Sequence, residues 1–393
     1  MKVQKKKYII WLIFICALIC GWICGCTRMY TESETMSPEP EITAGEVETT
    51  PEPETATSEP ETTVVEIETT TVQEENTMMT EEVNTMGYYG ALHVENGKLC
   101  DAANNPVALK GISTAGLQWF PQYVNEETFA FLKEATGMNV IRLAMYTAEG
   151  GYCHKDANGK LEMEALIDKG VKAATELDLY VVIDWHILSD NNPNNYKEES
   201  KAFFDKMSKQ YAGYDNVIYE ICNEPNGNTS WEDIKQYANE VIPVIRNNDT
   251  DAIVLVGTPT WSQDIDKAMR SPLEYENIMY TYHFYAADHV STMQVMDAYS
   301  NGFPVFISEF GFMESSGDGD INESSGDNWR KVLDERNISY VAWNISNSKG
   351  SASIFKDGSS DMTDMSDDNL KTWGVYLKNW DRSKSGLDKL AIE

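Results

Sequence analysis

Two short stretches of the sequence each present one carboxylate at the end of an apolar run. Residues 216–227 read NVIYEICNEPNG, and the β-branched and aromatic start of this stretch is typical of a buried strand. Residues 306–311 read FISEFG and repeat the pattern, with Glu309 two residues before a glycine. A carboxylate at a strand end, with an amide beside it as in Asn223-Glu224, suits acid/base chemistry. For either stretch alone, the alternative is a charged residue that opens a solvated turn.

Short apolar runs alternate with segments of helical periodicity through residues 87–393. The runs lie at 107–112, 140–145, 180–185, 217–221, 253–256, 278–282, 304–307 and 340–343. The helix candidates between them include 126–135, 164–177, 198–211, 231–245 and 328–336. Ahead of the first run, Asn96-Gly97 separates two short β-prone segments, as in a tight hairpin. We therefore predict an α/β fold, a (β/α)8 TIM barrel with a short N-terminal β-hairpin, and a doubly wound open sheet is the alternative.

In such a barrel the carboxyl ends of all the strands meet at one mouth. Charged and aromatic residues recur at the predicted strand ends: Arg142, His186, Asn223, Glu224, His283, Tyr285, Glu309 and Trp343. Any one of them alone could be a satisfied core or rim residue. Their agreement on six strands favours one site, and two carboxylates there meet the needs of glycosidic-bond cleavage. One carboxyl group protonates the leaving sugar while the other stays ionised.

Tryptophans near the predicted element ends offer flat apolar faces for sugar rings. They are Trp119, Trp231, Trp261 and Trp343. Each, taken alone, can equally be an ordinary packing residue.

Many motifs between residues 90 and 343 resemble, in the right order, those of family 5 glycoside hydrolases, and specifically the bacterial endoglucanases of its subfamily 2. Besides the two carboxylate stretches, the matching segments are 110–114 (KGIST), 116–120 (GLQWF), 140–143 (VIRL), 184–186 (DWH), 257–262 (GTPTWS) and 282–285 (YHFY). The resemblance implies a retaining endo-β-1,4-glucanase (cellulase) that acts on a β-glucan polysaccharide through a covalent glycosyl-enzyme and needs no metal or organic cofactor. It implies Glu224 as the general acid/base and Glu309 as the nucleophile, about 5 Å apart.

The resemblance also implies supporting roles. Arg142 would keep the nucleophile ionised, Asn223 would hold the 2-hydroxyl of the sugar being cleaved, and His283 and Tyr285 would form hydrogen bonds around the two glutamates. The predicted substrate-binding residues are His186, Tyr146, Trp119, Trp231, Trp261, Trp343 and Lys349.

The sequence departs from the family pattern at places that bear on the substrate. Ala115 stands where family members commonly have His. After Trp343, Ser348 and Gly350 replace Lys and Glu, and Lys349 is displaced by one position. Mannan, xyloglucan or mixed-linkage glucan therefore remain alternative substrates for the same mechanism. A second alternative is a surface protein that binds polysaccharide without cutting it, which would be expected to lack a catalytic group.

The N-terminus has the charge-then-hydrophobe order of an export signal. Four lysines between positions 2 and 7 precede an apolar run at 8–24, and residues 23–26 (ICGC) resemble the lipobox of bacterial lipoproteins. We therefore expect a signal peptide at 1–25, lipidation of Cys26, and a protein held on the extracellular face of a bacterial membrane. The alternative is an uncleaved N-terminal anchor, since about 17 apolar residues approach the length of a membrane span.

Residues 26–86 are expected to form a disordered linker rich in Thr, Glu and Pro, ahead of a catalytic domain at 87–393. The stretch 31–86 contains 16 Glu and no Lys or Arg, which is half of the formal charge of −32, and it has too few apolar residues to build a core. The moderate acidity of the remainder argues against nucleic-acid binding. We expect the catalytic domain to act as a monomer. Its three cysteines, Cys100, Cys153 and Cys222, show no disulfide-framework or metal-ligand spacing, although one disulfide remains possible.

Overall fold

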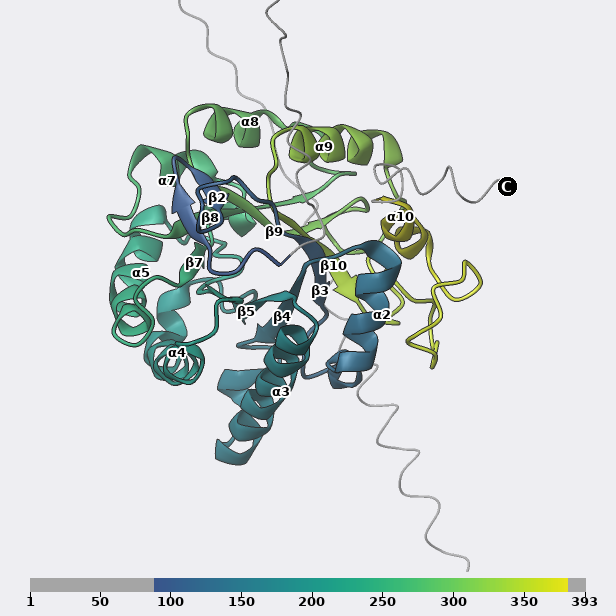
Figure 1. Cartoon of the computed structure of the whole chain (residues 1–393), viewed down its shortest axis with the longest axis horizontal. Helices are drawn as coiled ribbons and strands as arrows, with labels where there is room; N and C mark the ends of the chain where they lie inside the picture. The colour runs from purple at the N-terminus through teal and green to yellow at the C-terminus, as the bar shows by residue number, and fades with distance from the viewer. Residues whose placement is uncertain (1–87, 381–393) are drawn as a thin grey trace, which may run out of the picture. The chain divides into compact units, whose positions relative to one another are not determined.

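The computed structural model describes residues 88–380, and the predicted signal peptide and linker lie outside this range. Its centre is a closed barrel of eight parallel strands, ordered β10-β3-β4-β5-β6-β7-β8-β9 (Figure 1). The strands are β3 (Lys110–Thr114), β4 (Val140–Tyr146), β5 (Tyr180–His186), β6 (Val217–Glu220), β7 (Ile253–Val256), β8 (Ile278–Tyr285), β9 (Val305–Gly311) and β10 (Tyr340–Ile345). Each strand pairs with its neighbours in the chain, and β10 closes the ring against β3. The predicted TIM barrel is confirmed, and the open sheet is excluded.

Helices surround the barrel in the order that the alternating pattern predicts (Figure 1). They are α2 (Glu126–Thr136), α3 (Ala157–Glu176), α4 (Lys197–Tyr211), α5 (Trp231–Arg246), α6 (Pro259–Ser262), α7 (Ile265–Arg270), α8 (Met293–Ser300), α9 (Glu323–Glu335) and α10 (Thr372–Trp380). Helix α3 begins seven residues before its predicted start. The side chain of Asp156 accepts a hydrogen bond from the backbone of Gly159 and caps the helix at that earlier position.

The predicted N-terminal hairpin is confirmed. Strands β1 (His93–Glu95) and β2 (Lys98–Cys100) pair antiparallel, and Asn96 and Gly97 between them have positive φ values of 52° and 76°. Leu99 of this hairpin belongs to a buried cluster that also contains Val182 of β5 and Phe306 of β9. The hairpin therefore packs against the apolar core at the amino-terminal end of the barrel.

The inner face of the strands changes from apolar to polar toward the carboxyl end. Because alternate residues of a strand face the same side, Val182 shares its face with Asp184 and His186, and all three are buried. Phe306 likewise shares its face with Ser308. Polar side chains are thereby concentrated at the carboxyl end of the barrel interior.

Two properties of the described residues bear on the sequence predictions. The three cysteines within 88–380 all have free thiols, so the disulfide that the sequence left open does not form there. Among the same residues, no helix is both long and apolar enough to cross a membrane.

Candidate active site

Arg142 is the centre of the polar end of the barrel. It is the third residue of β4, rather than the last as the sequence suggested, and it is fully buried. Its guanidinium pairs with Glu220 (Nε to Oε2, 2.7 Å), Asp184 (Nη2 to Oδ2, 3.0 Å) and Glu309 (Nη1 to Oε2, 3.2 Å). Burial by itself lowers the pKa of Arg142, but these three carboxylates raise it above its ordinary value. The guanidinium is therefore a fixed positive charge.

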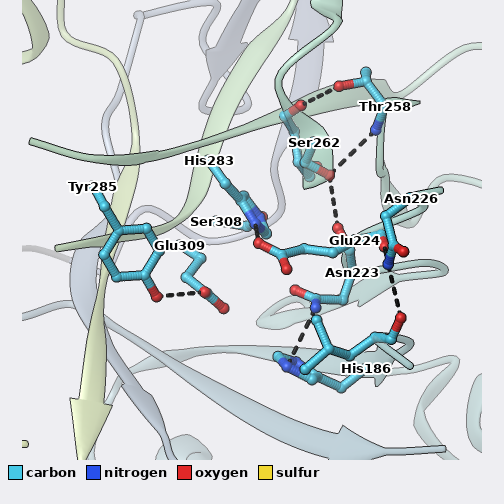
Figure 2. A network of polar contacts seen from close by, with 12 residues as sticks. His186, Asn223, Glu224, Asn226, Thr258, Ser262, His283, Tyr285, Ser308 and Glu309 are labelled. Atoms are coloured by element: carbon cyan, nitrogen blue, oxygen red, sulfur yellow. Dashed lines mark hydrogen bonds and ion pairs between the residues drawn. The ribbon is translucent and has the colours of Figure 1, made fainter. Parts of the chain in front are cut away.

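The two predicted catalytic glutamates meet at this end of the barrel in different surroundings (Figure 2). A carboxylate oxygen of Glu224 and one of Glu309 lie within 4.8 Å of each other, and both side chains are buried. Glu309 lies in β9 and accepts hydrogen bonds from Arg142 and from the Tyr285 hydroxyl at 2.8 Å. Glu224 follows β6, and its Oε1 lies 2.8 Å from Nδ1 of His283. Glu309 has two donors that favour an ionised carboxylate, whereas Glu224 faces a histidine.

Electrostatics separate the two carboxyl groups further. Burial raises the pKa of Glu224 to about 8, with contributions in the same direction from Asp184 and Glu220, against the lowering effect of Arg142. Burial and the nearby Glu224 also raise the pKa of Glu309, but the positive charge of Arg142 opposes that increase. Since two carboxylates this close cannot easily both ionise, the shared proton belongs on Glu224.

Asn223 is held in a fixed orientation by three protein contacts. Its Oδ1 accepts from Arg142 Nη2 at 2.7 Å, and its Nδ2 donates to the carbonyl of Ile187 at 3.0 Å and lies 3.2 Å from His186 Nε2. Burial lowers the pKa of His186 well below its usual range, so the ring is neutral. Its Nδ1 then donates to Asp184 at 2.6 Å, and its Nε2 accepts from Asn223. His186, predicted to contact sugar, thus orients the amide that precedes Glu224.

Aromatic rings line one side of the carboxylate pair. The Trp343 ring stacks on His186 with centroids 5.3 Å apart and planes 13° apart, and Tyr146 lies 4.1 Å from the same histidine. Trp119 extends the series, with its ring 4.8 Å from that of Tyr146 and half of its surface exposed. These three predicted substrate-binding residues therefore form one continuous aromatic surface.

Trp261 lies on the opposite side of the barrel mouth. It follows β7, which is four strands from β3 in a ring of eight, and it is 45% exposed. Thr260, Trp261 and Ser262 all have positive φ, near 55° to 60°, an unusual conformation that surrounding contacts must hold. The backbone N–H of Trp261 donates to the Pro225 carbonyl at 3.0 Å. Ser262 Oγ donates to the Asn223 carbonyl at 2.7 Å (Figure 2). The turn that exposes Trp261 is thus hydrogen-bonded to the loop that carries Glu224.

The structure places one predicted substrate contact, Trp231, away from the barrel mouth. Trp231 begins α5 and is only 6% exposed, because its indole Nε1 donates to the Ser271 carbonyl at 2.8 Å and its ring packs edge-on against Tyr280. It packs the helix against the outside of the barrel. Lys349 lines a polar groove together with Lys371, and its contact with the sugar stays a prediction.

Two buried residues of the site, Glu220 and Ser308, were not predicted from the sequence, and a third, Asp184, was expected at a strand end but was given no role. All three lie within strands, and each contacts a predicted site residue: Asp184 and Glu220 contact Arg142, and Ser308 contacts His283 at 2.9 Å. The available signal was a polar residue at an inward-facing position of an otherwise apolar strand.

Glu224, His283 and Glu309 form the one group among residues 88–380 whose donor atoms lie close enough to share a cation. Those atoms already have protein partners, since His283 Nδ1 pairs with Glu224, and Glu309 accepts from Arg142 and Tyr285. These three side chains are therefore arranged to share protons through hydrogen bonds rather than to bind a cation.

A family model described as Cellulase (glycosyl hydrolase family 5) matches residues 100–349. The chain belongs to glycosyl hydrolase family 5. This glycosyl hydrolase is 45% identical over 296 residues to endoglucanase A of Butyrivibrio fibrisolvens, covering 74% of this chain and 68% of the relative. It is also 45% identical over 300 residues to an endoglucanase of Clostridium saccharobutylicum, covering 76% of this chain and 66% of the relative. The predicted enzyme class, a glycoside hydrolase with endoglucanases as relatives, is confirmed.

Solved structures show the same fold for the family 5 domain. Cellulase Cel5C_n superposes with a TM-score of 0.71 at 37% identity, covering 74% of this chain and 92% of that one. The catalytic domain of Thermobifida fusca endoglucanase Cel5A, in complex with cellotetraose, superposes with a TM-score of 0.68 at 35% identity, covering 74% and 97%.

The raised pKa of Glu224 predicts the alkaline limit of activity. A general acid must be protonated, and the protonated form of Glu224 is present below about pH 8 and is lost as the pH rises through that value. We expect kcat/KM on a soluble cellulose derivative to fall about tenfold per pH unit above this limit. The fluorescence of the tryptophans at each pH provides the control that the enzyme stays folded. A limit near pH 5, where an ordinary glutamate titrates, would contradict the burial effect.

Proposed function

We propose that this enzyme is a retaining endo-β-1,4-glucanase that hydrolyses cellulose or related β-glucans. The observation that carries the proposal is the short separation of the carboxylates of Glu224 and Glu309, since one oxygen of each lies within 4.8 Å of the other. Retaining glycosidases hold their two carboxyl groups about 5 Å apart, whereas inverting enzymes leave roughly 6.5 to 9.5 Å for a water molecule. The short separation favours direct attack by one carboxylate.

In the first step Glu309 attacks the anomeric carbon and Glu224 protonates the departing sugar oxygen. Arg142 and Tyr285 hold Glu309 ionised and aimed, since both donate to its oxygens. The bond that forms joins Glu309 to the sugar, and the bond that breaks is the glycosidic one. Glu309 is then an uncharged ester.

In the second step Glu224 takes a proton from water, and the oxygen of that water replaces Glu309 on the sugar. Losing the negative charge of Glu309 removes one of the influences that keep Glu224 protonated, so its pKa falls between the two steps. One residue can therefore act as acid and then as base.

Endo action is supported by the position of the exposed tryptophans. Trp119 follows β3 and Trp261 follows β7, on opposite sides of the mouth, with the carboxylate pair at the ends of strands between them. Sugar rings stack on such flat faces. A chain bound to both tryptophans would extend past the cleavage point in both directions.

The choice of β-glucan depends on the three positions at which the sequence departs from the family pattern. Ala115 is buried, the Ser348 hydroxyl bonds to Ser353, and Gly350 lies against the backbone of Gly317. None of these three positions supplies a charged group, so stacking contributes more to binding here than ion-assisted hydrogen bonds. The names of the relatives, which are endoglucanases, support cellulose rather than mannan, xyloglucan or mixed-linkage glucan as the substrate. The full set of catalytic groups argues against a protein that only binds polysaccharide.

Substitution of the two glutamates tests the reaction. Glu309→Gln should reduce release of reducing ends from a soluble cellulose derivative to background, because the nucleophile is gone. Glu224→Gln should lower the rate by roughly 10²- to 10⁴-fold, but spare the first step on an aryl cellobioside whose leaving group needs no proton. Glu314→Gln, at an exposed glutamate five residues after the nucleophile, is the matched control.

The same assay, run with mannan, xyloglucan and mixed-linkage glucan in parallel, tests the substrate. A fall in viscosity that precedes the release of reducing ends would support endo action. Activity on one of the other polymers but not on cellulose would change the assigned substrate and leave the proposed mechanism unchanged. Folded enzyme without activity on any polymer would support the binding-protein alternative.

We also propose that lipid on Cys26 holds the enzyme at the extracellular face of a bacterial membrane. The support is the lysine-rich start, the apolar run and the cysteine that follows it. Cys26→Ser should abolish incorporation of labelled fatty acid, whereas Cys24→Ser should leave the incorporation intact. Membrane retention without fatty-acid labelling of the natural chain would instead indicate an uncleaved anchor.

A further inference from the structure

A continuous chain of buried hydrogen bonds leads from the general acid back to Arg142. Glu224 Oε1 lies 2.8 Å from His283 Nδ1, and His283 Nε2 lies 2.9 Å from Ser308 Oγ. Ser308 donates to Glu220 Oε1 at 2.7 Å, and Glu220 Oε2 accepts from Arg142 Nε at 2.7 Å. All five side chains are buried. Because Arg142 also holds Glu309, the chain connects the two catalytic carboxylates behind the reaction centre.

The direction of each hydrogen bond follows from the number of protons available. Both oxygens of Glu220 accept hydrogen bonds, as in an ionised carboxylate, so Ser308 must donate its one proton to Glu220. Ser308 can then only accept from His283, which places the imidazole proton on Nε2. Burial lowers the pKa of His283 to about 4, so the ring is neutral and carries this one proton. Nδ1 is then an acceptor, and its bond to Glu224 requires Glu224 to be the donor.

We propose that Glu220 and Ser308 are positioning residues that keep the general acid protonated, by fixing the single proton of His283 on Nε2. The proposal rests on the proposed function, in which Glu224 is that acid. The substrate oxygen then competes with His283 Nδ1 for the proton of Glu224. After the transfer, the Glu224 carboxylate faces a bare nitrogen lone pair, which favours its taking a proton back from water. One fixed tautomer therefore supports both steps.

Groups from five of the eight strands act on Glu224. The charged or titratable side chains near it are Arg142 and Tyr146 of β4, Asp184 of β5, Glu220 of β6, His283 and Tyr285 of β8, and Glu309 of β9. Among them Arg142 favours the ionised form of Glu224, while the carboxylates favour the protonated form. The hydrogen-bond chain acts in the same direction as the carboxylates. Substitutions of Ser308 separate its contribution, because they interrupt the chain and leave every charge in place.

Glu220→Gln should reverse the donor and acceptor roles along the hydrogen-bond chain. Its amide oxygen must face the Arg142 donor, so its NH₂ group faces Ser308 and donates to it. Ser308 then donates to His283 Nε2, the imidazole proton moves to Nδ1, and that N–H stabilises ionised Glu224. We expect the alkaline limit of kcat/KM on cellotetraose to move down by about one pH unit, because the ionised form of Glu224 gains a charge-assisted hydrogen bond. Loss of the Glu220 charge acts in the same direction.

Ser308→Ala breaks the hydrogen-bond chain with less effect on Arg142, and should shift the alkaline limit of kcat/KM in the same direction. Ser308→Thr keeps the hydroxyl and should leave that limit at its natural value. Ser113→Ala removes a buried hydroxyl that faces Arg142 from outside the chain, and is expected to leave the limit in place. With a dinitrophenyl cellobioside, whose leaving group needs no proton, the shift should disappear. Circular dichroism of each variant checks folding.

Equal loss of kcat/KM at every pH in Glu220→Gln and Ser308→Ala, with the alkaline limit unmoved, would overturn the proposal and leave a structural role. A shift that persists with the activated substrate would also overturn it, because it would not concern the general acid. Failure of the proposed function has a different signature: natural enzyme that does not cleave cellotetraose, or cleaves it without an alkaline limit.

Discussion

The active site depends on one buried cation that is shared by several carboxylates. Arg142 contacts Glu220, Asp184 and Glu309 within 3.2 Å, and also holds the Asn223 amide. Removing such a cation would leave three carboxylates buried without a counter-charge, which proteins tolerate poorly. The arginine comes from β4 and its partners from β5, β6 and β9, so the constellation exists only when the barrel is closed. Fold and chemistry are thereby coupled through a single side chain.

The barrel also makes two chemically identical side chains different. Glu309 lies within β9 and receives hydrogen bonds from a guanidinium and a phenol, whereas Glu224 follows β6 and faces a neutral imidazole. Burial raises the pKa of both, but only Glu309 has donors that compensate directly. The surroundings therefore favour the protonated form of Glu224 at neutral pH and the ionised form of Glu309, as the proposed mechanism requires. The buried apolar side chains at the amino-terminal end of the barrel, which include Leu99 of the hairpin, exclude water from that end.

The barrel and its principal site residues could be predicted from the sequence, because strand ends carry local signals. Glu224 and Glu309 stand beside Pro or Gly after apolar runs, and those runs set the eight strands. Glu220 and Ser308 escaped prediction because their importance depends on which face of a strand points inward and on the stagger between β6, β8 and β9. Trp231 was misplaced because the first residue of a helix can face either the mouth or the barrel wall, and packing against Tyr280 decides it.

The most direct test of direct attack by Glu309 is the stereochemistry of the first product. Hydrolysis of cellotetraose followed by proton NMR within the first minutes separates the α and β anomers of the newly formed reducing end before they interconvert. Two displacements at the anomeric carbon, the first by Glu309 and the second by water, preserve the configuration, so the β anomer should appear first. Initial appearance of the α anomer would mean a single displacement by water, and would contradict a covalent intermediate on Glu309 despite the short separation of the carboxylates.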